Sequence, residues 1–119
     1  MLDVKDRYGG IDSLLFWPTY TNIGVDDRSQ FDLFLAMPGG LPGVRTVVDQ
    51  LHASGVKVLL PYNPWDLGTR RDAQHRDDAT LLDELILAVD ADGFNGDTMG
   101  SVPQVGGNRT TMHAHDACL

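Results

Sequence analysis

The repeated order of helix and strand constrains the fold of this chain more than any other feature of its sequence. Apolar residues recur with helical spacing over 42–54 and again over 78–90, and a short extended segment follows each helix. Gly55 suits the end of the first helix, and the apolar run 56–60 after it reads as a buried strand. The second helix leads into a strand over 93–96. Successive helix and strand units of this kind predict βα repeats, in which the strands run parallel.

The two predicted helices each carry one apolar stripe that would face the core. The stripes are Val44, Val47, Val48 and Leu51 in the first helix, and Leu81, Leu82, Leu85, Ile86 and Val89 in the second. Pro42 suits the first helical position of the first helix, and Asp78 can cap the second. His52 falls on the side of its helix away from the valines, and we expect it to be exposed.

Two further elements are predicted before these units. The continuous apolar run 14–17 predicts a strand covered on both faces, and Pro18 stops it. The apolar spacing within 31–35 predicts a short helix, which must end before Pro38. No regular element is predicted for 1–13, because this segment is polar and contains two consecutive glycines.

Three parallel strands with helices between them predict an α/β fold. A closed (β/α)₈ TIM barrel needs about 200 residues or more, so a chain of 119 residues would supply about half of one. A small open α/β domain is the alternative. We expect a partial barrel domain over 1–99, with its helices on one side of the sheet. Residues 100–119 lack any helical or strand period and predict an irregular, disordered tail.

The composition and charge limit the class of partner. A hydrophobic share of 42% with 22% charged residues is typical of a globular chain and argues against overall disorder. A net charge of −8 disfavours nucleic acid and anionic membranes as partners.

Two features of the sequence favour a cytoplasmic location. The first residues are acidic where a signal peptide is basic, and the single cysteine, Cys118, leaves no internal disulfide. The open strand edges of a half barrel would favour self-association.

Aromatic and polar side chains follow the predicted strands at their C-terminal ends. Parallel strands bring these ends to one edge of the sheet, where α/β folds hold their ligands. Aromatic rings beside acids and amides suit a sugar, because its C–H faces stack on rings and its hydroxyls form hydrogen bonds. The candidate carbohydrate-binding residues are Trp17, Tyr20, Asp26, Asp27, Arg28, Tyr62, Asn63, Trp65, Asp66 and Asn95.

Two parts of this candidate set have a simpler explanation. Trp17 and Trp65 could close the mouth of the sheet without contacting a ligand. The run Asp26-Asp27-Arg28 could clamp a substrate, but a solvated ion pair in a loop explains it as well. Asp66 is expected to bind substrate hydroxyls.

Asp97 is the candidate catalytic residue. It follows the predicted strand 93–96, so it would lie at the C-terminal end of that strand. Gly96 has no Cβ and would let the backbone approach a bound group closely. An aspartate that caps the next turn is the alternative.

The segment Asp92-Gly-Phe-Asn-Gly-Asp-Thr-Met99 resembles the nucleophile segment of glycoside hydrolase family 31, which has the form Asp-Gly-Phe-Trp-x-Asp-Met-Asn-Glu. Gly55-Val-Lys-Val-Leu-Leu-Pro61 resembles the preceding strand of that family and of the related α-galactosidases. The resemblance covers about residues 44–99 and implies a TIM barrel that hydrolyses glycosides with Asp97 as the nucleophile. It also implies that a later strand supplies the general acid. A non-catalytic carbohydrate-binding or truncated α/β domain is the alternative.

The sequence predicts neither a cofactor nor a metal. Gly68-Thr-Arg-Arg71 lacks the lysine and the glycine spacing of a phosphate-binding loop. No glycine-rich loop follows the first predicted strand, which disfavours a doubly wound nucleotide-binding domain. His113-Ala-His-Asp-Ala-Cys118 contains metal-binding residue types, but the sequence has no second cluster of ligands that would complete a site.

Overall fold

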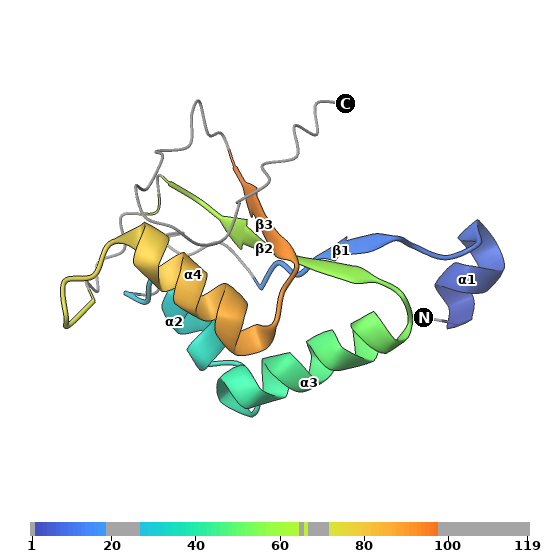
Figure 1. Cartoon of the computed structure of the whole chain (residues 1–119), viewed down its shortest axis with the longest axis horizontal. Coiled ribbons are helices and arrows are strands. Elements are labelled where there is room, and N and C mark those ends of the chain that lie inside the picture. The colour runs from blue at the N-terminus through green and yellow to red at the C-terminus, as the bar shows by residue number, and fades with distance from the viewer. Residues whose placement is uncertain (1, 19–26, 65, 67–71, 98–119) are drawn as a thin grey trace.

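The computed structural model describes residues 2–18, 27–64, 66 and 72–97 of the chain. The elements run in the order α1 (Leu2–Tyr8), β1 (Ser13–Leu15), α2 (Gln30–Leu35), α3 (Gly40–Ala53), β2 (Lys57–Tyr62), α4 (Asp78–Val89) and β3 (Gly93–Gly96) (Figure 1). The predicted alternation of helices and strands is confirmed. The predicted tail, 100–119, lies outside the described residues.

The three strands form one parallel sheet in the order β1-β2-β3. β2 is central, and its Leu59 aligns with Leu15 of β1 and with Gly93 of β3. The α/β fold with a parallel sheet is therefore confirmed, and the half barrel stays a prediction.

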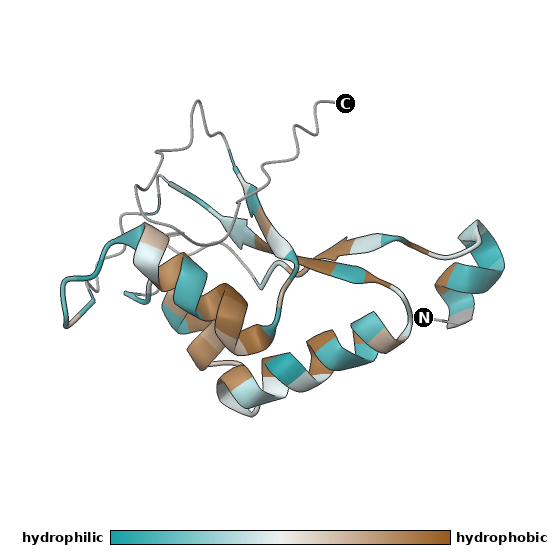
Figure 2. Cartoon of the chain, viewed as in Figure 1, coloured by the Kyte–Doolittle hydropathy of each residue, from teal (hydrophilic) through white to brown (hydrophobic). Residues whose placement is uncertain are grey.

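The core lies on one face of this sheet. Val58 and Leu60 alternate on that face of β2, and both are fully buried. They pack with buried side chains of α2, α3 and α4, and the whole cluster is Phe34, Val44, Val48, Val58, Leu60, Leu85 and Val89. Figure 1 shows α2, α3 and α4 together on one side of the strands, and in Figure 2 the hydrophobic colour gathers on α4 and along the strands. The predicted packing of the helices on one side is confirmed.

The boundaries of the two longer helices differ slightly from the prediction. α3 begins at Gly40, two residues before Pro42, and Gly39 precedes it with a left-handed φ of 78°. Val47 was expected in the buried stripe, but it is 42% exposed, so the stripe is narrower than predicted. The cap of α4 is Asp77, whose side chain accepts the Thr80 N–H at 2.7 Å, and not the predicted Asp78.

The N-terminal segment differs more. α1 was not predicted, and it lies apart from the other helices at one end of the structure (Figure 1). Gly9 ends this helix: its φ is 78° and its N–H donates to the Lys5 carbonyl at 2.9 Å. β1 is shorter than the predicted strand, because it ends at Leu15. Among the described residues, no helix combines the length and the apolar character that a membrane crossing requires.

Candidate functional site

Two predicted site residues meet where β2 and β3 end. Gly96 aligns with Tyr62, and the Asp97 N–H donates to the Tyr62 carbonyl at 2.8 Å. Asn63 and Asp97 are the residues that directly follow this last pair. Neighbouring strands lie about 4.8 Å apart, so these residues are adjacent at the C-terminal edge of the sheet. Asn95 lies two residues before Asp97 on the same face of β3 and is exposed.

The main chain of Asn63 is held by the side chain of Gln30. The Asn63 N–H donates to Oε1 of Gln30 at 2.9 Å, and Nε2 of Gln30 donates to the Asn63 carbonyl at 3.0 Å. Asn63 is only 4% exposed, and its side-chain Oδ1 has no hydrogen-bond partner within the part of the chain that the structure describes. A buried acceptor in this state is uncommon, because buried polar groups nearly always have a hydrogen-bond partner.

Asp66 is engaged with α2. It ends a tight turn in which its N–H donates to the Asn63 carbonyl at 3.1 Å. Its Oδ2 accepts the N–H of Gln30, the first residue of α2, at 2.9 Å, and the residue is 7% exposed. Ser29 and Asp32 cap the same helix end locally. The carboxylate of Asp66 thus caps a distant helix, and the expected bond from this group to a substrate hydroxyl stays a prediction.

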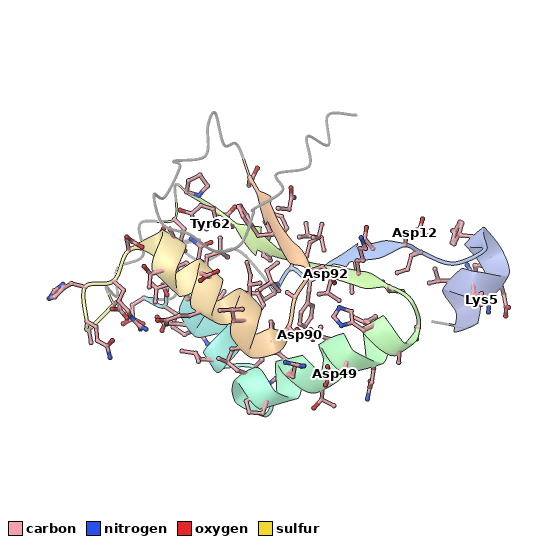
Figure 3. All side chains as sticks on the ribbon, in the orientation of Figure 1. Lys5, Asp12, Asp49, Tyr62, Asp90 and Asp92 are labelled. Atoms are coloured by element: carbon pink, nitrogen blue, oxygen red, sulfur yellow. The ribbon has the colours of Figure 1, made fainter. Side chains whose placement is uncertain are left out.

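Tyr62 belongs to the opposite, helix-covered face of the sheet. Its hydroxyl donates to Oδ2 of Asp78 at 3.2 Å, and its ring meets Phe94 edge to face at 6.1 Å. Burial, and then the charge of Asp78 and the hydrogen bond to it, raise the pKa of Tyr62 to about 12, so the phenol stays protonated near neutral pH. Figure 3 shows Tyr62 beside the start of α4. The structure does not bring this ring to the face that carries Asn95.

The other candidate binding residues are described in part. Trp17 is half-buried just past β1, while Asp27, which is exposed, and Arg28, which is half-buried, directly precede α2. Each of these three takes part in an interaction within the structure. Tyr20, Asp26 and Trp65 lie outside the described residues, so the predicted Asp26-Asp27-Arg28 clamp stays a prediction.

A histidine and an aspartate pair at the opposite end of the sheet. Nε2 of His52 lies 2.8 Å from Oδ2 of Asp92, and the same oxygen accepts the Val58 N–H at 2.7 Å. His52 was expected to be exposed, and its side chain is partly exposed, at 31%. Figure 3 shows Asp92 between the end of α4 and the start of β3, beside α3 and far from Tyr62. This pair holds α3 to the sheet.

Replacing Asp92 with asparagine should make stability less dependent on pH in the acid range. Burial raises the pKa of Asp92, but hydrogen bonds from Val58 N–H and His52, with the charges of His52 and Lys57, outweigh it and lower the pKa. The charged form therefore stabilises the fold above the ordinary Asp pKa of about 3.9. This contribution is lost as the pH falls through the lower, folded-state pKa.

The measurement is urea unfolding of wild type and Asp92→Asn at a series of pH values. We expect the variant to be less stable near neutral pH and the difference to close in strong acid. Asp83→Asn, on the exposed side of α4, is the matched control and should show no such pattern. A stability gap that stayed constant down to the lowest pH would show that the charge of Asp92 is not the source of the effect.

Gln30 is a member of the site region that sequence reasoning missed. A glutamine in the first turn of a short helix has no distinguishing pattern, and its partners lie 33 and 36 residues away in the chain. Among the described residues, no group of three or more His, Cys, Asp or Glu side chains is placed to hold a metal ion. The histidine-rich segment 113–118 lies outside the described residues.

The resemblance of segments 55–61 and 92–99 to glycoside hydrolase family 31 stays a prediction from the sequence. Comparison of the chain with protein-family models, with curated proteins and with solved structures found no match.

Proposed function

We propose that this chain contributes to a glycoside-acting α/β barrel that binds a carbohydrate where β2 and β3 end, with Asp97 as the nucleophile. One observation carries the proposal: Tyr62 pairs with Gly96 and the Asp97 N–H donates to the Tyr62 carbonyl, so Asn63 and Asp97 directly follow the last paired residues at the C-terminal edge of a parallel sheet. This is the edge at which barrels of this class hold their substrates. The resemblance of the segment 92–99 to a glycosidase nucleophile segment supports the same role for Asp97.

The chemistry assigns different roles to the two residues. In a retaining glycosidase, a carboxylate attacks the anomeric carbon while a second carboxyl protonates the leaving oxygen. Asp97 would make that attack, and the Oδ1 of Asn63, which lacks a donor among the described residues, would accept a hydroxyl of the sugar. Asp66 is committed to the N-terminus of α2, so the general acid is not assigned to it.

The test is covalent labelling by 2-deoxy-2-fluoroglycosyl fluorides of glucose, galactose, mannose and xylose, in both anomeric forms. Attack by Asp97 forms a bond from its carboxylate oxygen to the anomeric carbon and releases fluoride. Because fluoride leaves without protonation, the reaction needs no general acid, and the 119-residue chain can be used as it is. Intact mass should rise by one fluoroglycosyl group, and peptide mapping should place the group on Asp97.

Asp97→Asn should abolish this labelling, because a neutral amide is a far weaker nucleophile than a carboxylate. Asp83→Asn removes an exposed carboxylate on α4 and should label like the wild type. Labelling of Asp97→Asn at the wild-type rate, or labelling mapped to another residue, would contradict the nucleophile assignment.

A non-catalytic carbohydrate-binding domain is the second candidate. The observation that favours it is the engagement of Asp66, the carboxylate of the turn after β2, with α2 rather than with the edge of the sheet. This alternative predicts that methyl glycosides bind the chain, with shifts of the Asn63 and Asp97 amide signals in nuclear magnetic resonance spectra. It also predicts that none of the fluoroglycosyl fluorides labels it.

A further inference from the structure

The buried polar residues of the described chain form a single cluster. They are Gln30, Asn63 and Asp66, at 8%, 4% and 7% exposed, and hydrogen bonds connect all three. Burying a polar group costs free energy unless the group forms a hydrogen bond. A hydrogen-bonded cluster of buried polar groups holds the segments that carry it in one fixed arrangement. Gln30 forms hydrogen bonds to both of the other residues.

Gln30 holds both ends of the turn that follows β2. Its carboxamide pairs with the N–H and the carbonyl of Asn63, in the way that a neighbouring strand would. Its backbone N–H binds the carboxylate of Asp66 at the other end of the turn. The Asn63 carbonyl also accepts the Asp66 N–H, so the polar groups of the Asn63 main chain are all engaged. The backbone from which the Asn63 side chain projects is therefore fixed by a residue of α2.

We infer that Gln30 is the positioning residue of the candidate carbohydrate site, because its carboxamide holds the backbone of Asn63, the residue that the proposed function places against the sugar. This inference rests on the proposed function. Gln30 contacts the main chain of Asn63 and not the sugar, so it acts through Asn63. A loss of the carboxamide pairing should weaken sugar binding without removing any group that touches the sugar.

Gln30→Glu tests the inference, because the variant can be switched by pH. Near neutral pH the introduced carboxylate accepts the Asn63 N–H but cannot donate to the Asn63 carbonyl, and it lies close to Asp66. Once protonated, the same carboxyl has both a donor and an acceptor and reproduces the carboxamide pairing. Burial and the Asp66 carboxylate raise the pKa of such a group, so protonation comes within a mildly acidic range.

The binding measurement uses methyl glycosides of glucose, galactose, mannose and xylose, with wild type at each pH as the reference. We expect Gln30→Glu to bind roughly tenfold more weakly near neutral pH, as for a lost buried hydrogen bond, and to recover toward wild type in acid. Gln30→Met has similar length without either bond and should stay weak at every pH. Gln50→Glu, at an exposed position on α3, is the matched control and should bind like wild type.

Hydrogen exchange of the Asn63 amide provides a readout independent of sugar. It should accelerate in Gln30→Glu near neutral pH and regain its protection, relative to wild type, in acid. Failure of wild type to bind any of the glycosides would refute the proposed function and this role with it. If wild type binds but Gln30→Glu and Gln30→Met bind equally well in acid, or if Gln30→Glu binds like wild type near neutral pH, the positioning role alone is refuted.

Discussion

Replacing Gly43 with alanine is expected to destabilise the chain by about 3 kcal/mol, although the same change inside a helix normally stabilises. Gly43 lies within α3, where alanine is favoured over glycine by about 1 kcal/mol. A Cβ at this position would meet the carbonyl oxygen of Pro38 too closely for the backbone of the turn before α3 to stay in place. A decrease in the free energy of unfolding, instead of the usual increase, would therefore be evidence for the close contact between this turn and α3.

Urea unfolding measures this effect, and Gly93→Ala is the matched control. A Cβ at Gly93 would lie 3.6 Å from Cδ2 of Leu59, which is an ordinary van der Waals contact, so the control should change stability little. Far-ultraviolet circular dichroism should show that both variants still form helices under folding conditions. A Gly43→Ala variant as stable as Gly93→Ala would mean that Pro38 does not approach α3 as the structure shows.

Truncating Leu60 to alanine should be comparably severe, at about 2–5 kcal/mol. Leu60 lies at the centre of β2, is fully buried and packs in the cluster that joins the sheet to α2, α3 and α4. Removing its side-chain atoms loses their transfer free energy and leaves a cavity that close-packed neighbours fill only in part.

Leu87→Ala makes the same chemical change on α4 at a position that is 66% exposed. It should alter the free energy of unfolding by no more than about 0.5 kcal/mol, as judged from urea midpoints at equal slope. Equal effects of the two truncations would show that the core does not lie between β2 and the helices.

The sequence alone determined which segments become helices and which become strands. Apolar spacing over 42–54 and 78–90, with glycine or proline at the ends, acts within a few residues through backbone sterics and local burial. The structure confirms these helices and the parallel strands. The errors are local as well: α1 was missed, because the polar composition of 1–13 and its two glycines predicted no regular element, whereas Gly9 only ends a helix that forms before it.

The sequence also placed Asn63 and Asp97 at one edge of the sheet, because Asp97 directly follows one predicted strand, Asn63 lies in the loop after another, and parallel strands end on the same side. The observed β2 runs on through Pro61 to Tyr62, so Asn63 is closer to the strand end than the prediction had it. It could not give the face on which each side chain lies. One step of register moves a side chain to the opposite face, and only the observed pairing shows that Tyr62 contacts Phe94 and Asp78 on the helix side.

The tertiary structure alone decided the polar contacts around the site. Asp66 caps α2 and Gln30 pairs with the main chain of Asn63 across separations of 36 and 33 residues, and His52 meets Asp92 across 40. No local pattern encodes such contacts, because they arise only when packing of the apolar faces brings loop and helix ends together. The spacing of hydrophobic residues therefore determines where the helices and strands form. The packing of these helices and strands then determines which polar groups come close enough to form hydrogen bonds.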